Sequence, residues 1–338
     1  MRAAVVGADG SMSVEQVADP TPGPGQLLLR VIGCGICGSD IKARPAMPGG
    51  TVMGHEFCGD VVGVGPQVSG DWREGMRAAV LPVFSCGDCV WCIAGEVAHC
   101  ESARLVGLGG SPGGFAELAL ASAELSFAVP ESIPEAHGAL VEPFSVGLHT
   151  ARVAKIAPGD SVLVLGAGPV GLTTTRWAKE MGAKDLVVAD PVAARRELSG
   201  RFGATAAIDP VQEDLGRDYD VVIDCVGKPG LLNTCVAAAA IKGRVVIAGV
   251  CAEPDSFVQM PALLKELTVA FSVYYLPGEF QRVIDAFTSG SIDPSPLIAG
   301  TVPLEEIDAA FRGVAESTTH SKILVDPRQA LAPPQRRA

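Results

Sequence analysis

The sequence predicts an α/β protein of about two domains, one rich in β-strands and one built on a doubly wound parallel sheet. Three observations support this fold class. The chain has 338 residues, enough for two domains of ordinary size. Its first third contains short runs of Val, Ile and Leu between glycines and prolines, which are typical of strands and turns. From about Pro158 onward, apolar strands alternate with helical segments, as in βαβ units around a buried parallel sheet.

The individual elements follow from this change of pattern. In the β-rich part, strands are expected at residues 3–6, 27–32, 59–64 and 76–81. In the alternating part, strands are expected at Ser161–Leu165, 186–189, Tyr219–Asp224 and 244–248, and helices at 169–181, 193–202 and 231–241. Toward the end of the chain, the pattern predicts a helix at 280–287, a further segment at 305–314 and a last strand at Lys322–Val325.

The composition narrows the classes of function. The chain has 26 Lys and Arg against 38 Asp and Glu, a formal charge of −12, and only Arg336 and Arg337 form a short basic pair. Nucleic acid is therefore not an expected partner. The longest uncharged stretch, 161–175, is interrupted by glycine and proline, so we expect no membrane span and a cytoplasmic protein. The ten cysteines would then be free thiols or metal ligands.

Four of the cysteines have a spacing that predicts a structural zinc site. Cys86, Cys89, Cys92 and Cys100 follow the pattern C-x2-C-x2-C-x7-C, and four thiolates can surround one tetrahedral Zn²⁺ without leaving a position for water. A bacterial iron–sulfur pattern would end in C-x3-C-P, which is absent from this segment. Buried free cysteines are the other interpretation, but little apolar sequence surrounds them.

A glycine-rich turn after the strand Ser161–Leu165 predicts a dinucleotide site. Gly166, Gly168 and Gly171 form G-x-G-x-x-G between that strand and a helix. The first glycine permits the tight turn, the second lets a pyrophosphate approach the backbone, and the third lets the helix pack on the strand. The first helical residues, Pro169 and Val170, lie at the positive end of the helix dipole, where phosphates bind.

An acidic residue after the next strand indicates which cofactor binds. Asp190 stands 19 residues after Gly171, where a carboxylate binds the ribose hydroxyls and repels a 2′-phosphate. Arg195 and Arg196 follow closely, and an arginine in this region can accommodate that phosphate. We therefore expect NAD, with NADP as the alternative.

A second zinc ion could be held by Cys37, His55 and Glu142. These residue types are zinc ligands, and three protein ligands leave a fourth position for a substrate. From the spacing alone, a structural pair of His55 with Glu56 explains the same residues. The cysteines outside both groups are expected to be buried thiols: Cys34, Cys58, Cys225, Cys235 and Cys251.

Taken together, these motifs resemble the zinc-dependent medium-chain alcohol and polyol dehydrogenases of the medium-chain dehydrogenase/reductase superfamily. The resemblance covers the chain to about Pro327 and rests on the segments 35–40, 54–56, 142–149 and 221–227, the four cysteines and the glycine turn. It implies a GroES-like catalytic domain at 1–146 and 277–338, carrying the structural zinc lobe, around a Rossmann domain at 147–276.

The resemblance also implies roles for individual residues. Cys37, His55 and Glu142 match the catalytic zinc ligands, and Glu56 matches a neighbouring glutamate that ligates or approaches the metal. An acid at position 142 is typical of the polyol and threonine-type branch. Ser39 matches the hydroxyl that relays the substrate proton. Lys42 stands where relatives often have a relay histidine, so the relay would end at this lysine or at water.

Further implications concern the cofactor, the assembly and the reaction. Arg195, Val226, Gly249 and Val250 are expected to contact the cofactor. Relatives usually form dimers or tetramers through the edges of their Rossmann sheets, and the uncharged run 268–275 is the expected edge. The implied reaction interconverts an alcohol, such as a secondary alcohol, diol or polyol, with its ketone or aldehyde, using NAD and zinc.

Two other functions fit parts of the pattern. One is a zinc-free, NADPH-dependent quinone or enone reductase of the same superfamily. The other is a non-catalytic nucleotide-sensing protein of the same fold, since fold alone does not imply function. The presence of Cys37, His55 and Glu142 argues against the first, and these residues with the intact glycine turn argue against the second.

Overall fold

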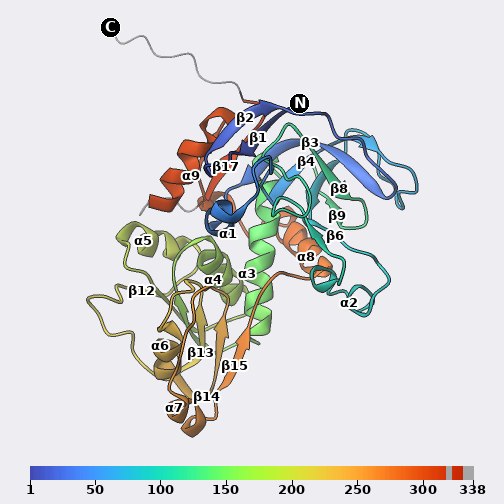
Figure 1. Cartoon of the computed structure of the whole chain (residues 1–338). Coiled ribbons are helices and arrows are strands. Elements are labelled where there is room, and N and C mark those ends of the chain that lie inside the picture. The colour runs from blue at the N-terminus through green and yellow to red at the C-terminus, as the bar shows by residue number, and fades with distance from the viewer. Residues whose placement is uncertain (317–321, 330–338) are drawn as a thin grey trace. The chain divides into compact units, whose positions relative to one another are not determined.

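The computed structural model describes residues 1–316 and 322–329 of the chain. These residues form two compact units (Figure 1). The first contains Met1–Glu142 and the described residues from Phe280 onward, and the second contains Pro143–Glu279. The chain passes between the units within two helices, α3 (Val141–Val153) and α8 (Pro277–Thr288). The sequence interpretation places these divisions slightly differently, after residues 146 and 276.

A seven-stranded sheet organises the first unit, and its strands come from both ends of the chain. The strands are β3 (Gln26–Gly35), β4 (Glu56–Val64), β5 (Arg77–Val80), β8 (Leu118–Ser122), β9 (Ser126–Ala128), β16 (Ile298–Val302) and β17 (Lys322–Val325). Their order is β16-β17-β3-β4-β5-β9, and β8 also pairs with β3. Phe57, Phe115 and Phe311 are buried in the core of this unit, and each such side chain contributes about 1.5–3 kcal/mol through burial.

Smaller elements complete the first unit. Two short ribbons are formed by β1 (Arg2–Val6) with β2 (Met12–Gln16) and by β6 (Val83–Phe84) with β7 (Arg104–Leu105). The helices are α1 (Gly38–Ala43), α2 (Val90–Ile93) and α9 (Ile307–Glu316). Short 3-10 turns are η1 (Arg44–Ala46), η2 (Val97–His99), η3 (Glu135–Leu140), η4 (Ser295–Leu297) and η5 (Leu304–Glu306).

The second unit contains a six-stranded parallel sheet, which confirms the predicted Rossmann-type architecture. Its strands are β10 (Ser161–Leu165), β11 (Asp185–Ala189), β12 (Ala206–Ile208), β13 (Tyr219–Asp224), β14 (Ala239–Ile247) and β15 (Thr268–Phe271), and its helices are α4 (Pro169–Glu180), α5 (Ala193–Arg201), α6 (Leu231–Ala238) and α7 (Gln259–Leu264). The sheet order is β12-β11-β10-β13-β14-β15. The order reverses at β10, and ligands bind at the carboxyl ends of the strands at such a reversal.

Two elements of the second unit are shorter than the sequence predicts. The expected helix at 231–241 ends at Ala238, and Ala239 already belongs to β14. Ala239 lies opposite Tyr219 of β13, so strand pairing overrides the helix propensity of this alanine-rich run. The expected strand at 268–275 is regular only over Thr268–Phe271, where it pairs with β14.

The prediction of buried thiols is wrong for Cys251, whose side chain is exposed. Cys251 lies in the exposed loop that follows β14. Cys34, Cys58 and Cys235 are buried as predicted, and Cys225 is partly buried.

No helix within residues 1–316 and 322–329 combines the length and the apolar character of a membrane span.

Candidate functional site

Cys37 and His55 lie close together and share one neighbour, Asp40. Cys37 immediately precedes α1, and its backbone N–H donates to Asp40 Oδ2 at 2.9 Å. The other carboxylate oxygen, Oδ1, lies 3.0 Å from His55 Nδ1. Asp40 is fully buried, so this contact fixes the plane of the imidazole ring. The second ring nitrogen, Nε2, lies 3.4 Å from the hydroxyl oxygen of Ser39.

Asp40 also determines which nitrogen of His55 can bind a metal ion. Burial alone would lower the pKa of His55, but the charge of Asp40 and its hydrogen bond raise that pKa well above the ordinary value. Because a carboxylate only accepts, Nδ1 carries a proton toward Asp40. Nε2 is therefore the nitrogen left for a metal ion.

Glu56 follows His55 at the start of β4 and is paired with a buried lysine of β17. Lys322 Nζ donates to both carboxylate oxygens of Glu56, at 2.7 Å to Oε1 and 2.6 Å to Oε2. It also donates to the carbonyl oxygen of Ile36 at 3.1 Å. Both charged side chains are 1% exposed. Such a buried pair is costly to break on one side, because the remaining charge would stay in the interior uncompensated.

Glu142 belongs to the same neighbourhood but stands outside the tightest group of donors. Ligand atoms of Cys37, His55 and Glu56 all lie within 4.8 Å of one another. Glu142 is buried in the first turn of α3. Burial alone would lower the pKa of Lys322, but the charges of Glu56, Cys37 and Glu142 raise it to about 12. Glu142 therefore adds to the negative charge that acts on Lys322.

The chemistry of this donor set fits a zinc ion. A thiol, an imidazole and carboxylates are the ligands that zinc takes in proteins. An imidazole whose other nitrogen bonds a carboxylate is the usual support for a metal-bound histidine, and Asp40 supplies it here. Lys42, the predicted end of the proton relay, lies on α1 with an exposed side chain, so the structure places it on the solvent side of that helix.

The four cysteines of residues 86–100 form a second donor group in the same unit. The sulfur of Cys86 lies 3.9 Å from that of Cys92 and 3.5 Å from that of Cys100, and Cys89 lies 3.6 Å from Cys92. Zn–S bonds of about 2.3 Å in a tetrahedron place the sulfurs about 3.8 Å apart, so these spacings match a zinc site. The Ser102 hydroxyl and the N–H of Cys86 lower the pKa of Cys100 to about 6, which favours the thiolate that a metal needs.

In the second unit, the glycine turn adopts a conformation that requires glycine. Gly166 has a φ of +94°, in the left-handed region. A Cβ on Gly171 would lie 1.9 Å from the carbonyl oxygen of Gly166, so only glycine lets the helix pack this closely. Gly168 precedes α4, and Pro169 occupies its first turn. The positive end of α4 therefore lies directly after β10, as a phosphate site requires.

Asp190 is held at this turn by two backbone N–H groups. Ala167 N–H donates to its Oδ2 and Val192 N–H to its Oδ1, each at 2.8 Å. Arg196 donates to the backbone carbonyl of Asp190 at 2.7 Å and pairs with Asp209 Oδ2 at 3.2 Å. Arg195, on the same helix α5, is partly buried.

The loops after β13 and β14 end at the same edge of the sheet. Asp224 Oδ1 accepts the N–H of Val226 at 2.7 Å, and the carbonyl of Asp224 accepts the N–H of Gly249 at 2.9 Å. A Cβ on Gly166 would lie 2.7 Å from Cγ2 of Val226, which shows that Val226 packs against the glycine turn. Val250 is 57% exposed. The structure thus gathers the predicted cofactor residues at the carboxyl ends of β10, β11, β13 and β14.

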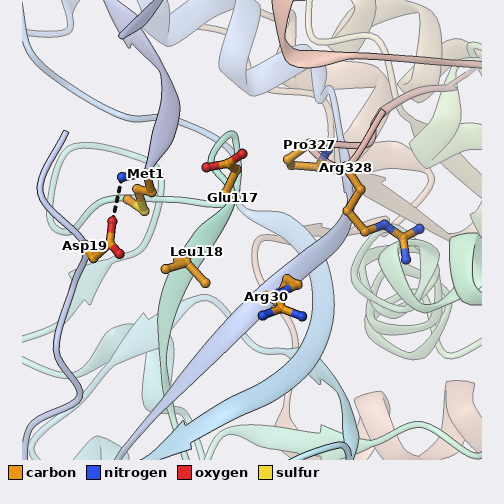
Figure 2. Close-up of a pocket in the computed structure, with 7 residues that line it drawn as sticks. All are labelled: Met1, Asp19, Arg30, Glu117, Leu118, Pro327 and Arg328. Carbon is orange, nitrogen blue, oxygen red and sulfur yellow. Dashed lines mark hydrogen bonds and ion pairs between the residues drawn. The ribbon is translucent and has the colours of Figure 1, made fainter. Parts of the chain in front are cut away.

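A hollow on the first unit lies away from all of these groups. Its volume is about 290 Å³. Figure 2 shows its lining residues, Met1, Asp19, Arg30, Glu117, Leu118, Pro327 and Arg328, and the ion pair between the amino group of Met1 and Asp19. None of them belongs to the donor groups or to the glycine turn. We assign this hollow no role in the chemistry.

Sequence reasoning missed Asp40, Lys322 and Asp209. Asp40 could have been found from the sequence, because an acidic residue three positions after the N-cap residue, here Cys37, is a helix-capping pattern. Lys322 had none, since it is 266 residues from Glu56 and only the sheet order β17-β3-β4 brings the two together. Asp209 likewise meets Arg196 only through the pairing of β11 with β12.

Two protein-family models match the chain. The model described as an alcohol dehydrogenase GroES-like domain matches residues 23–131. The model described as a zinc-binding dehydrogenase matches residues 169–289. L-Galactonate-5-dehydrogenase from Escherichia coli K12 is 33% identical over 305 residues, which cover 86% of this chain and 88% of that protein.

Two solved structures resemble the whole chain and differ in their cofactor. A protein from Sinorhizobium meliloti 1021 bound to NADP has a TM-score of 0.90 and 33% identity, covering 96% of this chain and 99% of its own. An alcohol dehydrogenase (rspB) from Escherichia coli CFT073 complexed with NADH has a TM-score of 0.90 and 31% identity, with the same coverage of 96% and 99%.

Proposed function

We propose a specific reaction for this chain. The chain belongs to the zinc-dependent medium-chain alcohol and polyol dehydrogenases, and it is an alcohol or polyol oxidoreductase. The reaction is the reversible, zinc-dependent transfer of hydride between a secondary alcohol, diol or polyol and NAD. The observation that carries the proposal is the group of Cys37, His55 and Glu56, with Asp40 fixing His55. The similarity to L-galactonate-5-dehydrogenase supports a polyhydroxylated substrate.

The catalytic zinc ion is held by Cys37, His55 and Glu142, with Glu56 beside it. The three donors have the chemistry of an open zinc site, in which one position is left for substrate. Cys37 and His55 are in place near each other, and the buried Glu142 lies close enough to influence the charge of the group. The four cysteines of residues 86–100 hold a second, structural zinc ion, because their sulfur spacings suit a closed tetrahedral site.

The residues around the metal position handle the proton. When bound, zinc polarises the substrate hydroxyl as a Lewis acid, and NAD takes up the hydride. The Ser39 hydroxyl, 3.4 Å from His55 Nε2, is placed to accept the substrate proton. Asp40 keeps the imidazole of His55 in one orientation. Lys42, exposed on the same helix as Ser39, is the outer end of the proton path.

The preferred cofactor is NAD, bound at the glycine turn with contacts from Arg195, Val226, Gly249 and Val250. Two backbone N–H groups hold the carboxylate of Asp190 at the turn, where its charge disfavours a 2′-phosphate. The guanidinium of Arg196 is already engaged by Asp209. We expect 5′-AMP to bind at least tenfold more tightly than 2′,5′-ADP, measured by calorimetry. Tighter binding of 2′,5′-ADP would assign the site to NADP instead.

Two copies of the chain associate along the edge strand β15, giving a dimer or a tetramer. β15 is the last strand in the sheet order, and Phe271 at its end and Val273 just after it are 74% and 51% exposed. Mass photometry of the wild-type protein and of F271D tests this assembly, since the charged variant should dissociate; a monomeric wild type would contradict it. Zinc-binding thiols need a reducing compartment, so we place the protein in the cytoplasm.

Metal analysis and a substrate panel test the proposed function. We expect about two zinc ions per chain and NADH formation with diols, polyols or other secondary alcohols. One zinc ion per chain with NADPH-dependent reduction of quinones or enones would favour the zinc-free reductase. Nucleotide binding without turnover of any alcohol would favour a sensing role.

A further inference from the structure

Two aspartates leave the parallel sheet of the second unit at neighbouring positions. Ala189, the last residue of β11, lies opposite Ile208, the last residue of β12. The residue after each strand is an aspartate, and the N–H of Asp190 donates to the carbonyl oxygen of Ile208 at 3.2 Å. The strand ends therefore bring the carboxylates of Asp190 and Asp209 to the edge of the sheet at which the glycine turn lies.

The two carboxylates have different partners. Backbone N–H groups occupy both oxygens of Asp190. Asp209 accepts the N–H of Val211 through Oδ1 at 3.0 Å, and its Oδ2 lies 3.2 Å from Nη1 of Arg196. The arginine is thus paired with the carboxylate of Asp209, which the loop after β12 holds in place.

The guanidinium of Arg196 also lies against the residue that is expected to bind the cofactor ribose. Its Nη1 donates to the backbone carbonyl of Asp190 at 2.7 Å. The side chains of Arg196 and Asp209 are 21% and 11% exposed. Because water and salt screen such a pair less than one on the open surface, Asp209 competes strongly for the guanidinium.

We propose that Asp209 is a specificity-determining residue, which holds the guanidinium of Arg196 so that it is not available to a 2′-phosphate. This inference rests on the proposed function, in which a dinucleotide binds at the glycine turn and Asp190 binds its ribose. An arginine near that acid ordinarily accommodates the 2′-phosphate of NADP. Asp209 acts through Arg196 and is therefore a positioning residue. The preference for NAD then depends on two carboxylates, one that repels the phosphate and one that occupies the arginine.

Loss of the charge of Asp209 would change the partner of Arg196. A phosphate accepts two parallel, charge-assisted hydrogen bonds from a guanidinium, whereas the carbonyl of Asp190 offers a single neutral acceptor. Asparagine at position 209 would keep an oxygen for the N–H of Val211 but would lack the charge that holds the guanidinium. The loop should then keep its fold while Arg196 turns to the phosphate.

The test measures the ratio of two dissociation constants, that of 2′,5′-ADP over that of 5′-AMP, by calorimetry on the whole chain. The two nucleotides differ only in the 2′-phosphate, so general damage to the site changes both constants together. We expect D209N to lower the ratio at least about tenfold, the scale of one hydrogen bond to a charged group, with the affinity for 5′-AMP near that of wild type. The control D185N removes an exposed acid at the other end of β11. Its ratio should stay within about twofold of wild type, because salt screens a distant exposed charge.

Removing the arginine as well shows whether Asp209 acts through it. In D209N/R196Q both charges are absent and a neutral pair replaces the ion pair. The ratio should therefore return to within about threefold of wild type, because no guanidinium is left for the phosphate. Arg195 is unchanged in all of these variants, so it cannot account for a difference between them.

The possible failures can be told apart. An unchanged ratio in D209N, or a ratio in D209N/R196Q as low as in D209N, would overturn the role of Asp209 alone. If D209N does not fold, a ratio in D209N/R196Q well above wild type would show that Arg196 already contacts the phosphate, which would overturn that role as well.

Two results for the wild-type protein concern the proposed function. Tighter binding of 2′,5′-ADP than of 5′-AMP would overturn the preference for NAD, and the comparison of D209N with D209N/R196Q would still decide the role of Asp209. Binding of neither nucleotide would overturn the cofactor site and this inference together.

Discussion

The two candidate metal sites of the first unit are built in opposite ways. The four cysteines lie within residues 86–100, and local turns bring all four sulfurs within 4.8 Å of one another, with Cys86–Cys100, Cys89–Cys92 and Cys86–Cys92 at 3.5–3.9 Å. The catalytic group joins Cys37, at the start of α1, with His55 and Glu56, at the start of β4, and these residues contact Asp40 and Lys322. The first site has four like donors, and the backbone N–H of Cys86 supports it by donating to the sulfur of Cys100. The second has unlike donors whose side chains contact buried charged groups. The two sites therefore differ in the support that their surroundings give to the metal ligands.

Removing the thiol of the open site should have the largest effect on turnover. In the proposed site C37A deletes a ligand of the catalytic zinc ion, and we expect the loss of several kcal/mol of Lewis-acid stabilisation to lower kcat by roughly three orders of magnitude. The variant should keep its circular dichroism spectrum and one zinc ion per chain. Full activity in C37A would show that Cys37 is not a ligand of a catalytic zinc ion.

Removing a thiol of the closed site should act on stability instead. C89A deletes one of four ligands, and the lost metal binding should cost several kcal/mol of unfolding free energy, or roughly 10 °C in Tm. Zinc content should fall by one ion, while kcat of the remaining folded protein changes little. C251S is the matched control, because its exposed thiol lies outside both groups. A Tm equal to that of C251S would contradict a structural zinc site.

Loosening the support behind His55 should affect only the open site. D40N replaces the carboxylate that holds Nδ1 of His55 at 3.0 Å, and we expect the affinity for the catalytic metal ion to fall about 10- to 100-fold. Chelator competition followed by metal analysis measures this, with the zinc ion of the four cysteines as an internal control. Equal loss from both sites would mean that the variant perturbs the fold rather than His55.

The smallest effect is expected at the outer end of the proton path. K42A removes an exposed amine on the helix that carries Ser39. Because water can replace an exposed group, we expect a change of a few-fold in kcat, seen as an altered pH–rate profile. R73A, which removes an exposed positive charge elsewhere in the same unit, is the control for a general change of surface charge. Superimposable pH–rate profiles for K42A and wild type would show that Lys42 takes no part in the proton relay.

Sequence reasoning worked where the chemistry depends on neighbours along the chain. The glycine turn was predicted because Gly166, Gly168 and Gly171 meet a strand and a helix within a few residues. The family and the fold class were predicted from such motifs, and both are confirmed. The predicted end of helix α6 was wrong, because Ala239 pairs with β13 in the sheet despite the helix propensity of alanine. The prediction that Cys251 is buried was wrong, because the burial of a loop residue depends on its tertiary contacts, which composition does not reveal.

The sequence by itself determined the cluster of four cysteines and the glycine turn between a strand and a helix, because each depends on residues that lie close together along the chain. Only the tertiary structure decided which charged side chains lie next to Glu56 and Arg196. Lys322 reaches Glu56 across 266 residues through the order β17-β3-β4, and Arg196 reaches Asp209 through the pairing of β11 with β12. The physical reason is that a buried charge takes its properties from whatever the folded sheets place next to it, and spacing along the chain carries no information about that neighbour.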